Sequence, residues 1–247
     1  MRSKELAKRN IKEVIRDPLS LGIAVALPLV LLLTLQALGG DDTPFLTPTL
    51  LTPGIVLFGF VMVMFSSAMI LARDRETSLL ARLLTTPLRS SDFVSGYSLP
   101  YLLVAIAQAA VLLAVGAMLG LDSAGSVVLV ALVLVLMAVF YVALGMIFGA
   151  LLSVAQTSGA YALVLILTIF GGAWFDLEEI GGVFLTIGDG LPFKHALDAT
   201  RAVMADGAGL GDIATDLYWI GAYTIGAVAL AVVTFQRRMR CLLYTSD

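Results

Sequence analysis

Long apolar runs alternate with short polar segments along most of the chain. Six of them reach the length, about 17–25 residues, with which an α-helix crosses the hydrocarbon core of a bilayer. Each run is bounded by charged or turn-forming residues, so the pattern predicts an all-α membrane protein with six transmembrane helices. The predicted spans are about 19–38, 51–72, 97–119, 127–152, 159–175 and 213–235.

Residues 1–18 precede the first span and have a different pattern, with six Lys or Arg and three acidic residues. The apolar residues of this segment fall close to one helical stripe: Leu6, Ile11, Val14 and Ile15. We therefore predict an amphipathic helix that lies on the membrane surface and ends at Pro18. The alternative interpretation is a solvated basic tail.

Composition supports the membrane assignment. Hydrophobic residues make up 60% of the 247 residues and charged residues 13%, and the mean hydropathy is +0.99. Soluble domains contain about 45–50% apolar and about 25% charged residues, so this chain could not cover its apolar surface in water. The only cysteine, Cys241, excludes an intrachain disulfide and a multi-cysteine metal site.

The distribution of basic residues predicts an orientation. All but two of the fifteen lysines and arginines lie in 1–18, in 73–89 or after residue 235, which the six spans place on one face. The exceptions are Lys194 and Arg201. They lie on the other face, where acidic residues gather: Asp41, Asp42, Asp122 and eight more between Asp176 and Asp216. The positive-inside rule therefore places both termini and the 73–96 loop in the cytoplasm.

The connector at 176–212 contains a run at 180–187 that is too apolar for a free loop and too short to span a bilayer. We predict re-entrant or interfacial helices here, with a break at Leu191-Pro192-Phe193 and a second short helix at about 196–204. Trp174 and Phe175 stand where an interfacial aromatic pair is expected. A small folded external cap is the alternative.

The sequence lacks the chemistry of an ATPase or an ion-coupled transporter. It contains no Gly-Lys pair, and hence no phosphate loop of the Gly-x-x-x-x-Gly-Lys-Ser/Thr type. Apart from Asp216 in the polar first turn of the last span, no Asp, Glu, Lys or Arg falls within the predicted spans. Ion-coupled transporters place such residues at membrane depth. The single histidine, His195, is expected to be satisfied or solvated, so we predict no catalytic, cofactor-binding or metal-binding residue.

Uncharged polar groups within the spans are predicted mainly to hydrogen-bond between helices, the alternative being to line a path for an amphipathic substrate. They are Thr34, Gln36, Ser66, Ser67, Gln108, Tyr141 and Thr168. Two Gly-x-x-x-Gly spacings, Gly116–Gly120 and Gly145–Gly149, would allow close helix approach, although a chain with 23 glycines produces such spacings by chance as well.

The polar segment at 73–89 separates the second span from the third. Ser78 could cap a short helix that ends at Pro87, and Ser90-Ser91-Asp92 offers a new cap before the third span. One face of that short helix would be apolar, formed by Leu79, Leu80, Leu83 and Leu84. A helix of this kind suits docking to a soluble partner or, equally, anchoring at the membrane surface.

This segment resembles the corresponding stretch of the ABC-2 type permeases, the membrane subunits of ATP-driven exporters of drugs, lipids and polysaccharides. The family usually reads Arg-Glu-x-Gly-Thr-Leu-Glu-x-Leu-Leu-x-Thr-Pro. This chain reads Arg75-Glu76-x-Ser78-x-Leu80-x-x-Leu83-Leu84-x-Thr86-Pro87 and departs from the family at Ser78, Leu79 and Ala81. The similarity extends to the basic start, the six spans and the Pro-Phe-x-His-x-Leu-Asp-Ala-x-Arg stretch at 192–201.

The resemblance implies that two permease subunits, as a homodimer or as two different permeases, form the pathway. Two separate nucleotide-binding ATPase subunits, which hold ATP and magnesium, would dock beneath them; nucleic acid is not an expected partner. Residues 1–18 and 73–89 would transmit the ATPase stroke, and 176–204 would form an outer gate. The candidate coupling residues are Arg73, Arg75, Glu76, Leu80, Arg82, Leu83, Leu84 and Pro87. The candidate gate residues are Trp174, Phe175, Phe184, Pro192 and Phe193.

Three alternatives to a drug, lipid or glycan exporter remain at this point. A haem-export-type permease shares the six-span layout, a non-transporting scaffold or assembly protein would also be apolar, and a membrane-embedded enzyme is disfavoured by the missing carboxylates and histidines. We expect one domain at 1–240 in a bacterial or archaeal inner membrane. Residues 241–247 resemble translated adaptor sequence, the alternative being an ordinary short tail.

Overall fold

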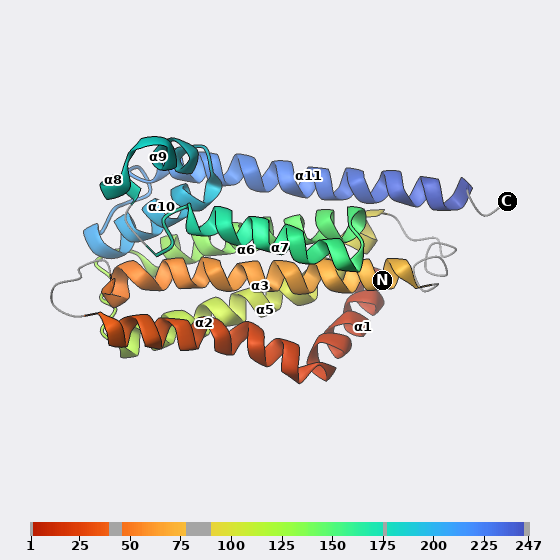
Figure 1. Ribbon diagram of the computed structural model, residues 1–247, viewed down its shortest axis with the longest axis horizontal. Helices are drawn as coiled ribbons and strands as arrows, with labels where there is room; N and C mark the ends of the chain where they lie inside the picture. Colours follow the sequence, from red (N-terminus) through yellow and green to blue (C-terminus); the bar gives the residue numbers. More distant parts are fainter. Residues whose placement is uncertain (1, 40–45, 78–89, 175–176, 245–247) are drawn as a thin grey trace.

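The computed structural model describes residues 2–39, 46–77, 90–174 and 177–244, and every regular element in these ranges is helical. The helices lie lengthwise side by side in a bundle (Figure 1). They are α1 (Arg2–Arg16), α2 (Pro18–Leu38), α3 (Pro48–Glu76), α5 (Ser90–Met118), α6 (Val127–Leu151), α7 (Val154–Ile169), α8 (Leu177–Ile180), α9 (Gly182–Asp189), α10 (Pro192–Asp206) and α11 (Ala214–Tyr244). The predicted all-α class is confirmed for these residues.

Four helices in the described part of the chain are long and apolar enough to cross a membrane, namely α3, α5, α6 and α11. They coincide with the second, third, fourth and sixth predicted spans. The first and fifth predicted spans coincide with shorter apolar helices, Gly22–Leu38 within α2 and Val154–Ile169 in α7. A crossing by these two helices therefore stays a prediction.

Several helices end at other residues than the predicted spans do. The second span was predicted to stop at residue 72, but α3 continues to Glu76, so the polar segment begins inside a helix. Residues 153–158 separate the fourth and fifth predicted spans, yet α7 begins at Val154. Ser153 and Gln156 form a capping box there that satisfies two amides of the first turn. This helix ends at Ile169 rather than near residue 175.

The connector helices differ in extent from their prediction as well. The run at 180–187 divides between α8 and α9, which meet at Gly181 and Gly182, both with φ of +63°. The second helix was predicted at about 196–204, but α10 runs from Pro192 to Asp206. Pro192 does not end a structure; it occupies the first turn of α10, where its missing N–H is not needed.

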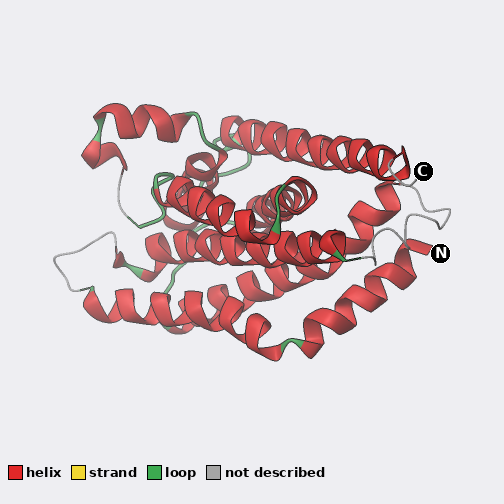
Figure 2. Cartoon of the chain, turned by 45° about the vertical axis from the view of Figure 1, so that its right-hand side comes forward, coloured by secondary structure: helices red, strands yellow, loops and turns green. Residues whose placement is uncertain are grey.

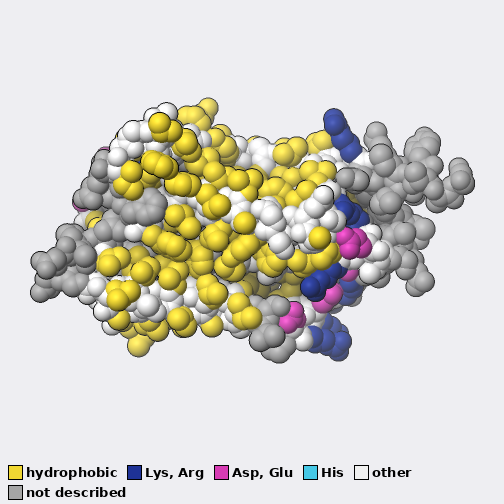
Figure 3. Space-filling model, viewed as in Figure 1, with side chains coloured by type: hydrophobic (Ala, Val, Ile, Leu, Met, Phe, Trp, Pro, Cys, Tyr) yellow, Lys and Arg dark blue, Asp and Glu magenta, His cyan; other side chains and the backbone are white. Residues whose placement is uncertain are grey.

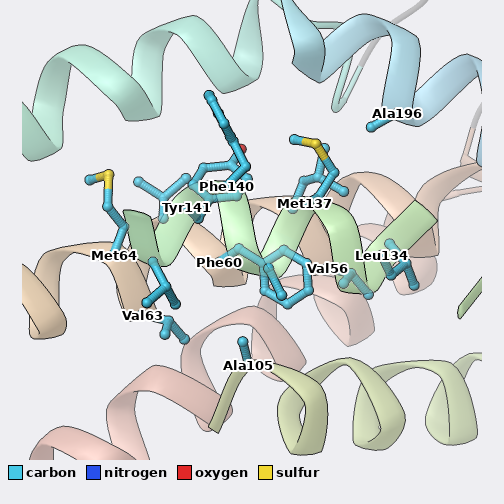
Figure 4. Packing of buried hydrophobic residues seen from close by; sticks show 14 of the residues in the cluster. Val56, Phe60, Val63, Met64, Ala105, Leu134, Met137, Phe140, Tyr141 and Ala196 are labelled. Carbon is cyan, nitrogen blue, oxygen red and sulfur yellow. The ribbon is translucent and has the colours of Figure 1, made fainter. Parts of the chain in front are cut away.

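Helix α3 forms the centre of the bundle and packs against α2, α5, α6, α7 and α10. Its side chains from Leu51 to Val61 are almost all inaccessible. Phe60 lies against Tyr141 of α6, with ring centroids 6.0 Å apart, and Val63 and Met64 continue the same core (Figure 4). Whatever moves α3 must therefore move most of the other helices.

Helices α3 and α6 approach each other closely at glycines. A Cβ atom on Gly145 would lie 2.0 Å from the Ser67 hydroxyl oxygen, and one on Gly149 would lie 2.6 Å from the Ala68 carbonyl oxygen. The spacing Gly145–Gly149 thus serves helix packing. Gly116 also faces α3, at Thr52, but Gly120 lies in a turn with φ of +97° beyond the end of α5.

Three of the uncharged polar groups join helices within the apolar part of the bundle. The Tyr141 hydroxyl group of α6 and that of Thr168 in α7 are 2.8 Å apart. The Gln108 side-chain amide of α5 donates to the Ala24 carbonyl of α2 over 2.9 Å. These contacts confirm the predicted role in helix pairing for Tyr141, Thr168 and Gln108.

The two ends of the bundle differ in composition. The described beginning of α1 and the end of α11 lie at one end, and α8, α9 and α10 lie at the other (Figures 1 and 2). On the face shown in Figure 3, Lys, Arg, Asp and Glu side chains gather at the first of these ends, beside a broad apolar surface. We call this end the basic end and the opposite one the connector end.

Substituting Gly145 tests the contact between α3 and α6. Gly145→Ala should push the helices apart and lower the stability by about 1–3 kcal/mol, as overpacking generally does, which corresponds to about 2–10 °C in the melting temperature. Gly159→Ala in α7 is the matched control, because a Cβ there meets nothing within 4 Å. The measurement is the melting temperature of the two purified variants in detergent. Equal melting temperatures would contradict the packing role of Gly145.

Candidate functional site at the basic end

Three helices are joined at the basic end by a buried carboxylate. Asp74, near the end of α3, is 7% exposed. Its Oδ2 atom accepts a hydrogen bond from the Tyr97 hydroxyl of α5 over 2.6 Å and lies 3.1 Å from Arg9 Nη2 of α1. Burying a charge is costly unless it is paired and hydrogen-bonded, so these two partners stabilise Asp74 in place.

A second contact holds α1 against α5 beside this carboxylate. Asn10 is inaccessible, and its amide nitrogen donates to the Gly96 carbonyl over 3.1 Å. Ala7, one turn earlier, is also buried. Helix α1 was predicted as a membrane-surface helix, and its helical form is confirmed over Arg2–Arg16; one of its faces packs on the bundle.

The charge of Arg9 is maintained by this environment. Partial burial lowers the pKa of Arg9, but the charge of Asp74 and the hydrogen bond to it outweigh burial and raise the pKa above its ordinary value. The same Nη2 atom lies 3.1 Å from Glu13 Oε2 one turn along α1. One guanidinium group thus serves two carboxylates, Glu13 and Asp74.

Arg75 and Glu76 hold the joint between α6 and α7. Arg75 donates to the carbonyl groups of Ala150 and of Leu152, the latter over 2.8 Å, at the end of α6. Glu76 Oε1 accepts the backbone N–H of Val154, the first residue of α7, over 2.9 Å. A cation thus faces the carbonyl end of one helix and an anion the amide end of the next, which is the favourable arrangement for both helix dipoles.

The remaining predicted coupling residues are placed only in part. Arg73 is exposed and lies at the edge of a cavity between α1, α2, α3 and α5. Five further coupling residues lie outside the described residues, as does the predicted short helix: Leu80, Arg82, Leu83, Leu84 and Pro87.

At the connector end, Arg201 of α10 ties three segments together. Its Nε atom donates to the Leu50 carbonyl of α3 over 3.0 Å, and its Nη2 atom donates to the Gly172 carbonyl after α7 over 2.9 Å. Gly54 of α3 passes so near this segment that a Cβ there would lie 2.0 Å from the Ala173 carbonyl oxygen. Arg201 therefore fixes α10 to the beginning of α3.

Lys194 and His195 of α10 also have polar partners. His195 Nδ1 lies 2.7 Å from Asp216 Oδ1, its Nε2 lies 3.1 Å from the Asp189 carbonyl oxygen, and its ring stacks on Trp219 at 5.4 Å. Burial lowers the pKa of Lys194, but contacts with Asp198 and Asp189 outweigh it and raise the pKa. The expectation of a satisfied histidine is confirmed.

The predicted gate residues do not form one cluster in the described part of the chain. Phe193 is buried against Phe140 and Tyr141 of α6, at 5.9 and 5.6 Å between ring centroids, and Pro192 begins α10. Trp174 packs on Phe58 of α3 at 5.4 Å. Phe184 is 47% exposed and stacks on Phe170 at 5.3 Å instead. Phe175 lies outside the described residues.

Sequence reasoning missed the residues that build the junction at the basic end, Arg9, Asn10, Asp74 and Tyr97. Asp74 lies within the polar segment, but nothing in the alternation of charges marks it as the buried member. A signal was present in the helical period, since Asp74 falls three and four residues after the buried Leu71 and Ile70. Extending the second span by one turn would have placed its carboxylate on the inner face.

A helical bundle with four candidate spans, an apolar flank and charges gathered at one end defines a multi-pass membrane protein. The chain belongs to the ABC-2 type transporter family, whose model matches residues 2–205. It is therefore a membrane transport component of the permease kind, not itself a catalytic subunit, and its family normally works with an ATP-binding subunit. The curated proteins offer no match to this chain.

Hydrogen exchange tests the contacts of Arg75 and Glu76 with the end of α6 and the start of α7, which we call the clasp. Arg75→Gln and Glu76→Gln should loosen the start of α7, because the Val154 amide loses a charged acceptor and the last carbonyls of α6 lose a charged donor. A hydrogen bond to a charged group contributes about 1.5–3 kcal/mol, so exchange of amides 152–157 should accelerate about tenfold or more.

Arg73→Gln provides the matched control, since Arg73 is exposed on the same turn of α3. Its exchange at 152–157 should equal that of the unaltered protein. Equal exchange in all three variants would mean that the capping box of Ser153 and Gln156 holds the joint without the clasp.

Proposed function

We propose that the chain is the permease subunit of an ATP-binding cassette exporter that moves a lipophilic or amphipathic substrate, such as a drug, lipid or glycan, outward. A separate nucleotide-binding subunit, which holds ATP and magnesium, docks at the basic end and supplies the energy. The observation that carries this proposal is the junction at Asp74, which joins α1 to α3 and α5 four residues before the segment at 78–89 begins in the sequence.

The proposed topology has six spans, with α2 and α7 crossing alongside the four longer helices, and both termini in the cytoplasm. The gathering of Lys and Arg at the basic end supports this orientation through the positive-inside rule. The membrane is then a bacterial or archaeal inner membrane. Helices α8 and α9 would form the outer, re-entrant part of the connector.

The proposed transmission route starts at residues 78–89, which connect α3 to α5. Leu80, Arg82, Leu83, Leu84 and Pro87 would contact the ATPase there. A force on this segment reaches the last turn of α3, where Asp74 passes it to α1 and where Arg75 and Glu76 pass it to the joint between α6 and α7. Helices from both halves of the chain would then move together.

The same helix offers a route to the proposed outer gate. Arg201 bonds α10 to the first turns of α3, so a displacement of α3 at the basic end is transmitted to the connector. Trp174 and Phe193 pack on α3 and α6 respectively and would follow it. Phe175, Phe184 and Pro192 complete the proposed gate.

The assembly we propose contains two copies of this chain and two ATPase subunits. Exposed apolar side chains on α11, among them Ile225 and Leu230, and on α7, such as Leu163 and Ile166, support a surface that meets lipid or a second permease. A haem-export-type permease or a non-transporting scaffold would fit the same fold. An ATPase partner that stimulates transport separates the exporter from the scaffold.

Co-purification from native membranes tests the docking proposal. The tagged chain should retain an ATPase subunit, and Leu83→Asp with Leu84→Asp should remove it, because two carboxylates would replace the apolar contact. The matched control makes the same change at exposed apolar positions of the connector end, Val183→Asp with Leu210→Asp, 72% and 57% exposed. This control should keep the ATPase.

Two results would contradict the proposal. Failure of any ATPase to co-purify with the unaltered chain would favour the scaffold. Loss of the ATPase from both double variants alike would show that the apolar surface in general, rather than the segment at 78–89, retains it.

A further inference from the structure

A single histidine holds the joint between α9 and α10 at the connector end. His195 of α10 is mostly buried, with 14% of its side chain exposed. Its Nδ1 atom lies 2.7 Å from Asp216 Oδ1 of α11, and its Nε2 atom lies 3.1 Å from the carbonyl oxygen of Asp189, the last residue of α9. The ring also stacks on Trp219 of α11, with 4° between the ring planes. One side chain thus connects α9, α10 and α11.

Both ring nitrogens of His195 face hydrogen-bond acceptors. A backbone carbonyl oxygen can only accept, and so can an ionised carboxylate. A neutral imidazole has one N–H, so it can satisfy one of the two oxygens and must turn a lone pair towards the other. The two contacts together therefore require one more proton than neutral His195 and ionised Asp216 provide. The count is the same if that proton resides on the Asp216 carboxyl group, because the two groups share it.

Donors from different elements satisfy the carbonyl groups at the end of α9. The two backbone amides that follow Asp189 bond to the carbonyls of the two residues before it. Tyr223 of α11 donates to the Gly190 carbonyl over 2.6 Å. The Nε2 atom of His195 has the same role for the Asp189 carbonyl, and its positive charge suits the carbonyl end of a helix. Loss of the Nε2 proton would remove this donor.

The titratable and charged groups that the described residues place around the ring come from three helices: Asp189 of α9, Lys194 and Asp198 of α10, and Asp216 and Tyr223 of α11. Burial lowers the pKa of Lys194, but contacts with Asp198 and Asp189 outweigh it and raise the pKa, so this ammonium group stays charged through neutral pH. Histidine is the side chain whose charge ordinarily changes between about pH 5 and 8. In this cluster the imidazole is therefore the group that responds to pH in that range.

We propose that His195 is a pH-dependent latch, closed when the imidazole is protonated, that holds the end of α9 against α10 and α11. At higher pH the neutral ring keeps its Nδ1–H bond to Asp216, because this contact is the shorter one and its acceptor is charged, and it releases the Asp189 carbonyl. The closed state binds the extra proton, so it weakens as the pH rises. The inference rests on the proposed function only in placing the connector end outside the cytoplasm.

The latch acts at one end of a short helix that begins at two glycines. Gly181 and Gly182 both have φ of +63°, a backbone conformation that glycine adopts readily. Opening at Asp189 would free the opposite end of α9. This helix carries Phe184, which is 47% exposed and stacks on Phe170. The latch would thus determine how firmly this part of the proposed outer gate is held.

Hydrogen exchange of the purified full-length chain in detergent, with a histidine-free tag and no ATPase, tests the latch. Corrected for the intrinsic effect of pH, amides 183–191 should exchange about fivefold faster at about pH 8.5 than at about pH 5.5. Amides 152–157 at the basic end are the internal reference. They should show no corrected change, since His195 is the only histidine of the chain.

Two variants should abolish the pH dependence in opposite directions. His195→Gln has no titratable ring and should exchange fast at both pH values. Asp216→Asn should exchange slowly at both, because the introduced amide can donate to Nδ1 of the neutral ring and leave Nε2–H for the Asp189 carbonyl. A merely structural contact would be weakened by both changes alike. Asp206→Asn, exposed at the far end of α10, is the matched control and should keep the fivefold difference.

Magnetic resonance of selectively labelled histidine gives a second readout, from one ring. At about pH 5.5 both ring nitrogens should carry a proton, and at about pH 8.5 the remaining proton should lie on Nδ1, which faces Asp216. Equal corrected exchange at the two pH values in the unaltered chain would overturn the proposal. Fast exchange of Asp216→Asn at both pH values, or a neutral ring with its proton on Nε2, would overturn it too.

The result is separable from that of the proposed function. Because no ATPase is present, a failure of the latch leaves the co-purification result untouched. Loss of ATPase retention equally leaves the pH dependence of exchange at 183–191 untouched.

Discussion

A carboxylate buried at the end of a helix that is long and apolar enough to cross a membrane must find partners, and this requirement shapes the basic end of the protein. Asp74 takes a hydroxyl from α5 and a guanidinium from α1. Removing either partner would leave a nearly inaccessible charge less compensated, so three helices are held in one arrangement. Helix α1 is thereby part of the bundle, although its composition is that of a surface helix.

Around this contact, α3 connects regions that are far apart in sequence. At the basic end its last turn bonds to α1, α5 and the joint of α6 with α7, and at the connector end its first turns bond to Arg201 of α10. Between them the helix is buried and makes close glycine contacts with α6. A tightly packed helix of this kind transmits displacement instead of absorbing it, which is what the proposed drive by an ATPase at the basic end requires.

Much of the fold could be predicted from the hydrophobic pattern. A long apolar segment in a bilayer must satisfy its backbone hydrogen bonds without water, and a helix does so within the segment itself. The helices coincide with all six runs, and the family assignment confirms the resemblance in the polar segment. Helix ends were less predictable. Capping by Ser153 and Gln156 and the extension of α3 depend on side-chain contacts that hydropathy does not register.

The candidate site was predictable only in its location. Arg75 and Glu76 were predicted as coupling residues, and that role stays a proposal; the structure shows that they bond to the end of α6 and the start of α7. Asp74 was missed because pairing over 65 residues with Arg9 leaves no local pattern.

A charge exchange tests the central role of the pair formed by Arg9 and Asp74. The variants are Arg9→Asp and Asp74→Arg, singly and together, in the complex with the proposed ATPase. Each single change should lower the melting temperature by about 2–10 °C and reduce ATP hydrolysis, since a like-charge contact replaces the pair. The account predicts that the double exchange recovers at least half of both losses. A double variant no better than the worse single one would contradict it.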